Sequence, residues 1–270
     1  MRVQANSSIG RKFSTGLLLA LAAGLISIVV SAETGADGAR RAERIARSGP
    51  ERVPLLELYS SEGCDSCPPA DAWFSRLKNN SGLWKRFVPL AFQVDYWDSL
   101  GWKDQLAKHE FADRQRAYAR ELASQQIYTP QLISDGRDWA GWRKGDGPQD
   151  FPAGSGAGIL EIVRSAPRSF KVTFSSSGGA QPTNLSLHFA LLGIGVTHRV
   201  TSGENRGREL KHDFIVLDLK TRAGRSKNGV TEAEFDAGTI DGVGGGAVAA
   251  WVTEPGELRA LQATGAYLSN

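Results

Sequence analysis

The stretch L-E-L-Y-S-S-E-G-C-D-S-C-P-P-A-D, residues 56–71, contains both cysteines of the 270-residue chain, Cys64 and Cys67. The apolar run that begins at Val53 indicates a buried strand, and the residues that follow, through Leu77, place apolar side chains at helical spacing. The two prolines directly after the second cysteine are tolerated in the first turn of a helix but not deeper in it. The cysteines are therefore predicted to lie where a strand leads into the N-terminus of a helix.

The close spacing of the cysteines predicts reactivity. A disulfide across two intervening residues constrains the chain little, because stabilisation by a cross-link rises with loop length. The helix dipole and its unpaired N–H groups lower the pKa of a thiol at this position. We predict that Cys64, more exposed, is the attacking thiolate and that Cys67 resolves the mixed disulfide. The carboxylate of Asp65 acts against the lowering of the Cys64 pKa. Because Ser66 stands where a strong oxidant would have a histidine, we predict a moderately reducing couple.

The residues after the cysteines alternate between strand and helix patterns. An apolar run at 87–94 indicates a second strand, and the apolar face spaced through 104–123 predicts a helix. A short strand begins at Thr129–Pro130, and its hairpin partner follows the turn Asp135–Gly136. A cis proline at Pro130 would leave the preceding backbone groups free to bind an extended substrate.

A glycine-rich break at 151–158 separates this half of the chain from one with a different pattern. After the break, apolar residues recur at period two in short runs, such as 170–174 and 185–189, with turn residues between them. Six to eight strands of this kind predict an antiparallel sandwich at 159–270. The predicted fold class is thus an α/β domain at 53–150 followed by an antiparallel β-sandwich-like domain.

The first 52 residues have the pattern of targeting and linking segments. Residues 1–32 combine basic residues, an apolar run and a small-residue end, as secretory signal peptides do. An uncleaved N-terminal anchor is the alternative. Residues 33–52 mix small and charged residues and are interpreted as a linker. We therefore expect the protein to be exported, to the periplasm or outside the cell.

Composition and charge exclude several classes of function. With 41% hydrophobic and 23% charged residues, the chain is neither disordered nor a polytopic membrane protein. Without residues 1–32, which hold three basic and no acidic side chains, 29 basic and 29 acidic residues remain. We expect no nucleic-acid partner, no stable membrane insertion after signal cleavage and no organic cofactor. The oligomeric state stays open, and no G-x-S-x-G motif supports hydrolase chemistry.

Two levels of resemblance follow from these motifs. The order strand, C-x-x-C-P, helix, strand, helix and T-P strand resembles the thioredoxin-like fold. The stretches 56–71, Val94–Asp104 and Tyr128–Leu132, with Gly203–Val216 and Ala249–Val252, resemble the secreted proteins of domain-of-unknown-function family 1223. The resemblance implies a thioredoxin-like domain with an appended β domain and no settled activity.

The resemblance to thioredoxins also implies roles for single residues. Cys64, Cys67 and Pro130 match the attacking, resolving and cis-proline positions. Glu57 is the candidate for the buried carboxylate that takes a proton from the resolving thiol, but it lies seven residues before the first cysteine instead of six. One position reverses the face of a strand, so an ion-paired or solvated strand residue is the alternative. Gly63 replaces the tryptophan usual before the first cysteine.

Three hypotheses for the function remain open. The first is an exported thiol–disulfide oxidoreductase that acts on protein or small thiol or disulfide substrates through Cys64 and Cys67. The second is a secreted binding or scaffold protein whose non-catalytic disulfide locks the helix start, and burial of both sulfurs would favour it over the enzyme. The third is a Cu(I)-handling protein that uses the same thiols. No metal site is predicted, because the four scattered histidines, at 109, 188, 198 and 212, are interpreted as surface or strand residues.

Two further segments carry possible functions. The loop Val94–Trp102 crowds aromatic and acidic residues at the end of the second strand, where it either lines a substrate groove or caps the core. Asp95 in this loop is a candidate for orienting it or for modulating the thiol. The basic stretch Gly203–His212 is interpreted as a turn between two strands, with an anion site as the alternative.

Overall fold

The computed structural model describes residues 42–145, 147–148, 154–156, 158–177, 184–239 and 244–269. The predicted signal peptide, residues 1–32, and the first part of the predicted linker lie outside these ranges. No helix in the described part of the chain has the length and hydrophobicity needed to cross a membrane.

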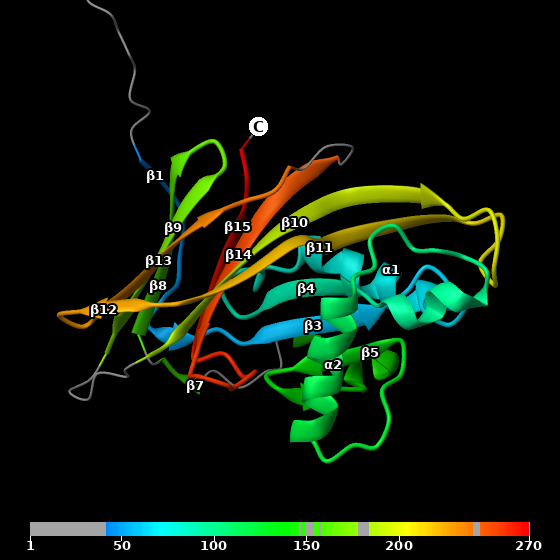
Figure 1. Cartoon of the computed structure of the whole chain (residues 1–270), viewed down its shortest axis with the longest axis horizontal. Coiled ribbons are helices and arrows are strands. Elements are labelled where there is room, and N and C mark those ends of the chain that lie inside the picture. Colours follow the sequence, from blue (N-terminus) through cyan, green and yellow to red (C-terminus); the bar gives the residue numbers. More distant parts are fainter. Residues whose placement is uncertain are drawn as a thin grey trace, which may run out of the picture. The chain divides into compact units, whose positions relative to one another are not determined.

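One sheet of eight strands runs through both halves of the sequence, in the order β15-β14-β10-β11-β4-β3-β5-β6 (Figure 1). Its strands are β3 (Leu55–Ser60), β4 (Val88–Gln93), β5 (Gln131–Ser134), β6 (Arg137–Asp138), β10 (Ser186–Arg199), β11 (Glu209–Ala223), β14 (Gly245–Thr253) and β15 (Gln262–Tyr267). The two halves meet at β11 and β4, which are parallel and paired at Ile215 and Ala91.

The predicted fold class, an α/β thioredoxin-like domain followed by an antiparallel β-sandwich-like domain, is wrong. The described chain consists mostly of strands, and strands from both halves form a single mixed sheet. All six residues of β4 are buried, so an unpaired β4 edge would leave buried backbone groups without partners. Strand β11 covers that edge. Period-two patterns predict where strands occur but not which edges pair.

A second sheet has five strands in the order β1-β8-β9-β13-β12. These strands are β1 (Glu43–Arg47), β8 (Gly158–Ala166), β9 (Ser169–Ser176), β12 (Arg225–Lys227) and β13 (Val230–Asp236); β2 (Glu51–Arg52) and β7 (Gly154–Ser155) form a separate pair. Strand β1 lies in the segment interpreted as a linker and pairs with β8. The five-stranded sheet packs on β10 and β14 through a shared apolar core that includes Phe174 and Phe189.

Two α-helices cover opposite faces of the β3–β4 part of the large sheet. Helix α1 (Pro68–Arg76) packs on the face that carries Leu56 and Leu58, and α2 (His109–Glu121) packs on the face that carries Tyr59. Three short 3-10 helices span Leu77–Asn79, Asp95–Leu100 and Gly141–Lys144.

Helix α2 begins later than predicted, at His109 instead of residue 104. The carboxylate of Asp104 accepts hydrogen bonds from the backbone N–H groups of Glu62 and Leu106, at 3.0 and 2.9 Å. These bonds hold residues 104–106 in a turn that ties this segment to the end of β3. A side chain that bonds nearby backbone groups competes with helix formation in this way.

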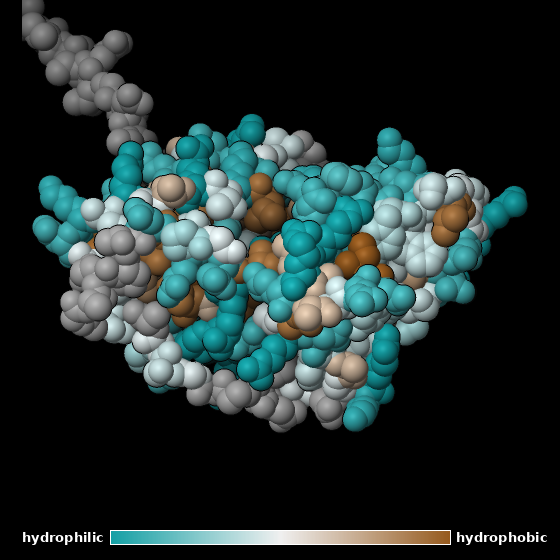
Figure 2. Space-filling model, turned by 60° about the horizontal axis from the view of Figure 1, so that its bottom comes forward, coloured by the Kyte–Doolittle hydropathy of each residue, from teal (hydrophilic) through white to brown (hydrophobic). Residues whose placement is uncertain are grey.

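The face of the protein shown in Figure 2 is mainly hydrophilic, with small and separate hydrophobic patches. Among the described residues, the large apolar or aromatic side chains that are exposed are Leu100, Leu122, Tyr128 and Tyr267. Scattered exposure of this kind is ordinary for a folded protein and does not indicate a docking face.

Close packing around Gly265 in β15 leads to a stability prediction. A Cβ atom there would lie 2.6 Å from ring atoms of Trp84 and 2.8 Å from the carbonyl oxygen of Val248. We expect Gly265→Ala to lower the free energy of unfolding by about 1–3 kcal/mol, because overpacking forces neighbours to move. Urea denaturation measures this, with Gly245→Ala as control, since its Cβ would meet Ile194 at an ordinary 3.9 Å. Equal effects of the two substitutions would contradict the explanation.

Candidate functional site

The two cysteines form a disulfide in the turn between β3 and α1. Cys67 directly precedes α1, and prolines occupy the first helical positions, where no backbone N–H is needed. Both cysteines are completely buried, although Asp65 and Ser66 between them are exposed. Cys64 is therefore not the exposed thiol that the sequence predicts, and an attacking thiolate cannot reach either sulfur in this conformation.

A loop from the second half of the chain is bonded to the disulfide turn. This covering loop, residues 200–208, joins β10 to β11. The basic stretch Gly203–His212 is thus a turn only through residue 208, because its last four residues belong to β11. The buried amide of Asn205 donates to the backbone carbonyls of Glu62 and Cys64, each at 2.8 Å. The carboxylate of Glu204 accepts from the backbone N–H of Asp65 at 3.2 Å. The covering loop is thus held by bonds to residues on both sides of Cys64.

The aromatic loop after β4 connects the disulfide turn with Pro130. The indole N–H of Trp97 donates to the hydroxyl of Thr129 at 2.8 Å. On the other side, Trp97 packs so close to Gly63 that a Cβ atom added to Gly63 would lie 3.2 Å from the Cβ of Trp97. The Thr129–Pro130 peptide bond is cis, and Pro130 is buried. Trp97 therefore bridges the residues that precede Cys64 and Pro130.

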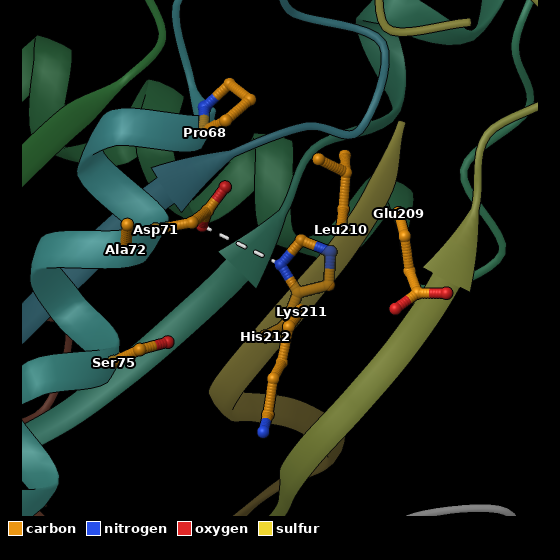
Figure 3. A pocket seen from close by; sticks show the side chains of 8 residues that line it. All are labelled: Pro68, Asp71, Ala72, Ser75, Glu209, Leu210, Lys211 and His212. Atoms are coloured by element: carbon orange, nitrogen blue, oxygen red, sulfur yellow. Dashed lines mark ion pairs between the residues drawn. The ribbon is translucent and has the colours of Figure 1, made fainter. Parts of the chain in front are cut away.

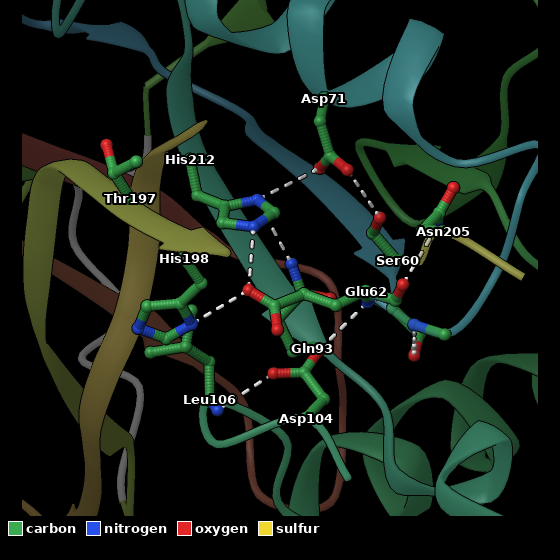
Figure 4. Close-up of polar contacts among 12 residues, drawn as sticks. Ser60, Glu62, Asp71, Gln93, Asp104, Leu106, Thr197, His198, Asn205 and His212 are labelled. Carbon is green, nitrogen blue, oxygen red and sulfur yellow. Dashed lines mark hydrogen bonds and ion pairs between the residues drawn. The ribbon is translucent and has the colours of Figure 1, made fainter. Parts of the chain in front are cut away.

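A cluster of buried and partly buried side chains surrounds Glu62, two residues before Cys64 (Figure 4). Its Oε1 lies 2.8 Å from Nδ1 of His198 and 3.2 Å from Nε2 of His212. Its Oε2 accepts from the indole N–H of Trp102 at 2.8 Å, and its backbone N–H donates to Asp104. The carboxylate is thus fully partnered although it is withdrawn from water. We call these residues, with Asp71, the Glu62 cluster.

Asp71 extends the cluster to the first turn of α1. Its Oδ2 accepts from the hydroxyl of Ser60 at 2.9 Å, and its Oδ1 lies 3.8 Å from Nδ1 of His212. The same Nδ1 lies 3.4 Å from the side-chain amide nitrogen of Gln93. The amide oxygen of Gln93 is buried and has no hydrogen-bond partner within the described chain. A half-turn of that amide would let its oxygen accept from a protonated imidazole. His212 thus lies between two carboxylates: that of Glu62, which precedes Cys64 in the sequence, and that of Asp71, which follows Cys67.

The pKa values in the cluster follow from burial and from these partners. Burial acts to lower the pKa of His212, but the carboxylates of Asp71 and Glu62 outweigh it and raise it to about 10. Burial acts to raise the pKa of Glu62, yet His212 and Trp102 leave it below its ordinary value. Burial, and then the charge of Glu62, raise the pKa of Asp104 to about 6. The cluster therefore holds an imidazolium and an ionised Glu62 carboxylate at neutral pH.

A bulge in β11 turns His212 toward α1. The pairing of β11 with β10 skips Phe214, which has a φ of 59° in the left-handed region that is unusual for a bulky residue. Val216 packs into the core on the α2 side, and strict alternation would place His212 on that same face. The extra residue reverses the alternation and brings the imidazole to Glu62.

Glu57 lies on the other side of the sheet, in a separate buried cluster. Arg114 donates to both of its carboxylate oxygens at 2.8 Å, and the hydroxyls of Tyr59 and Tyr118 donate to them at 2.8 and 2.6 Å. Helix α1 packs on the opposite face of β3, the face that carries Leu56 and Leu58. The structure thus brings Cys64, Cys67 and Pro130 to one region and places Glu57 with α2.

Sequence reasoning did not find Glu62 or Asp71 as site residues, and it considered His212 only as part of a possible anion site in the stretch Gly203–His212. Glu62 and Asp71 flank the cysteines within the stretch 56–71, and an acidic residue at the end of a buried strand was the available signal. The partner His212 is 150 positions away from Glu62 and was interpreted as a surface or strand residue. Of the other histidines, His188 is buried between two threonine hydroxyls and stacks on Trp251.

No group of three or more histidine, cysteine, aspartate or glutamate side chains in the described ranges has an arrangement that could hold a metal ion. The two sulfurs, which a Cu(I) site would need as thiolates, are bonded to each other.

The fold and site define a class of protein: a mixed eight-stranded sheet that carries a buried disulfide beside a buried acid–base cluster. Residues 55–253 match the family described as "Protein of unknown function (DUF1223)", and the chain belongs to this family. The resemblance in the sequence motifs is thereby confirmed at the level of the family. No curated protein matches the chain.

Two solved structures share this fold. A crystal structure of an Agrobacterium tumefaciens protein has a TM-score of 0.57 and 24% sequence identity, covering 82% of this chain and 97% of that chain. The protein HBP35 of Porphyromonas gingivalis has a TM-score of 0.54 and 13% identity, covering 82% of this chain and 76% of that chain. At these identities the similarity concerns the fold alone.

Proposed function

We propose that Cys64–Cys67 is a gated redox pair, which exchanges with small thiols when the covering loop moves off it. The observation that supports this proposal is the position of the cross-link. It joins residues three apart at the start of α1, and the buried carboxylates of Glu62 and Asp71 flank it. A loop this short stabilises by roughly 2 kcal/mol in the chain-entropy model, less than a long-range staple. Buried titratable groups around a reactive pair are typical of functional sites.

The exchange needs a small thiol as reductant. Its thiolate attacks Cys64, the bond to Cys67 breaks, and the released Cys67 sulfur takes up a proton. A second small thiol then attacks the mixed disulfide, which leaves the reduced pair and one small-molecule disulfide. Two electrons pass to the protein, and both protons come from the two small thiols. In the reverse direction Cys64 attacks a disulfide and Cys67 resolves it.

Burial of both sulfurs limits what this pair does. An open enzyme that presents a thiolate to large protein substrates requires exposed sulfur, and we do not propose that activity. A covered pair responds to the surrounding thiol pool at a rate set by loop opening. The proposed function is therefore that of a redox-responsive protein, not of a general oxidoreductase.

A second candidate is a binding or scaffold protein in which the disulfide only locks the start of α1. The complete burial of Cys64 and Cys67 favours it. The two candidates differ in reduction potential: about −270 to −120 mV for an exchanging pair and below roughly −300 mV for a structural one.

Substitution of Asn205 tests the gate. We expect Asn205→Ala to increase the rate of disulfide reduction by excess glutathione about tenfold, because two hydrogen bonds of roughly 0.5–1.5 kcal/mol each hold the loop closed. Mass spectrometry of alkylated protein at timed intervals measures the rate. Asn79→Ala, at an exposed position away from the loop, is the matched control and should leave the rate unchanged.

The same experiment separates the two candidates. A potential in the exchanging range, with faster reduction of the Asn205 variant, supports the gated pair. If wild type and variant are reduced only as fast as the whole protein unfolds, the disulfide is a structural lock and the redox proposal fails.

We also infer export, which rests on the signal-peptide pattern of residues 1–32. An oxidising compartment outside the cytoplasm would form the disulfide during or after transport. Cell fractionation with N-terminal sequencing tests this. A cytoplasmic protein that retains Met1 would contradict it.

A further inference from the structure

A cavity of about 400 Å³ lies between α1 and β11, beside the Glu62 cluster (Figure 3). The residues that line it are Pro68, Asp71, Ala72 and Ser75 from the helix and Glu209, Leu210, Lys211 and His212 from the strand. The four helical residues follow a spacing of three and four, so they form one stripe along α1. The volume is within the range of small-molecule sites, at its lower end.

Two oxygen atoms on this stripe have unused hydrogen-bonding capacity. Asp71 Oδ2 accepts from Ser60, but Oδ1 is 3.8 Å from His212 Nδ1, too far for a hydrogen bond. The Ser75 hydroxyl oxygen is buried and has no hydrogen-bond partner in the described ranges. Figure 3 shows both side chains extending from α1 toward β11. A buried polar atom without a partner costs free energy, so such atoms indicate a missing donor.

The charges around the cavity favour a positive ligand. Glu209 and Lys211 are exposed at the rim of the cavity, and their opposite charges offset each other. The imidazolium of His212 is hydrogen-bonded to Glu62, which does not line the cavity. His212 also forms an ion pair with Asp71 at 3.8 Å, so Asp71 shares this cation with Glu62 and its charge is only partly compensated. The remaining walls, Pro68, Ala72 and Leu210, are apolar.

We propose that this cavity binds a small organic cation, a primary amine on an apolar body. The ammonium group, with three donors, would bond Asp71 Oδ1 and the Ser75 hydroxyl, which lie one helical turn apart. The apolar body would lie against Leu210 and Pro68. This site is separate from the proposed exchange chemistry, and the disulfide stays intact while it is filled.

Titration of the oxidised protein with phenethylamine tests the proposal, with 2-phenylethanol as the neutral analogue of the same size. We expect the amine to bind at least tenfold more tightly by calorimetry, because only the amine brings a charge that pairs with the Asp71 carboxylate, which otherwise shares His212 with Glu62. Asp71→Asn should weaken amine binding at least tenfold. Asp113→Asn, an exposed aspartate on α2, is the matched control and should change it less than twofold.

A second variant keeps the test decisive if Asp71→Asn does not fold. Ala72 is an exposed wall residue, so Ala72→Phe should fill the cavity without disturbing the core and should abolish amine binding. Equal binding of amine and alcohol, no binding of the amine at millimolar concentration, or full binding by the Ala72→Phe variant would each overturn the proposal.

Discussion

His212→Leu is expected to lower the free energy of unfolding by about 3–5 kcal/mol at pH 7, because removing one partner of a buried ion pair leaves the other charge uncompensated. The substitution would leave the carboxylates of Glu62 and Asp71 buried at the disulfide turn without their shared cation. Urea denaturation measures the effect. His188→Leu is the matched control: this histidine is also buried, but burial lowers its pKa to about 3, so it carries no charge there.

The pH dependence of stability adds a second readout for His212. Its folded-state pKa is raised from 6.5 to about 10. A group with a raised pKa stabilises fully below its unfolded pKa and loses that contribution as pH rises through its folded pKa. The stability difference between wild type and His212→Leu should therefore be largest below pH 6.5 and shrink between pH 6.5 and 10. A difference that does not vary with pH in this window would show that packing, and not charge, sets the effect.

Arg114→Leu is expected to destabilise the protein by about 3–5 kcal/mol, for the same reason on the other side of the sheet. Arg114 is the cation that pairs with the buried carboxylate of Glu57, and its guanidinium also lies 5.5 Å from the ring of Trp251. Without Arg114, the hydroxyls of Tyr59 and Tyr118 would be the remaining partners of the buried Glu57 carboxylate. Thermal and urea denaturation both measure the loss.

The double variant Glu57→Gln/Arg114→Leu distinguishes charge from packing. Glutamine keeps an acceptor for the hydroxyls of Tyr59 and Tyr118 and removes the unpaired charge. We expect it to recover at least half of the loss caused by Arg114→Leu. If the double variant is as unstable as the single one, the guanidinium acts by filling space against the aromatic rings.

Many local elements were predictable because they depend on neighbours in the sequence. The buried run that becomes β3, the helix that starts behind the two prolines at Pro68, and the hairpin around Asp135–Gly136 all occur in the structure. Hydrophobic period, proline chemistry and turn residues encode these elements within a few positions. The close pairing of Cys64 with Cys67 belongs to the same local level.

The order of the large sheet and the composition of the site were not predictable in this way. The edge of β4 accepts β11, and nothing within β4 specifies which later strand will pair there. His212 reaches Glu62 only because a bulge at Phe214 reverses the face of the strand. The predicted role of Glu57 is a further case, since its side chain belongs to the cluster around Arg114.

The sequence by itself determined most of the strands, both helices apart from the start of α2, the family and the presence of two nearby cysteines, because short-range periodicity and spacing carry that information. The tertiary structure decided that the two halves share one sheet, that Asn205 bonds the backbone of the disulfide turn and that two carboxylates meet a histidine beside it. These features depend on contacts across more than 120 residues. Such contacts form where free strand edges and buried charges find partners, and local patterns do not specify those partners.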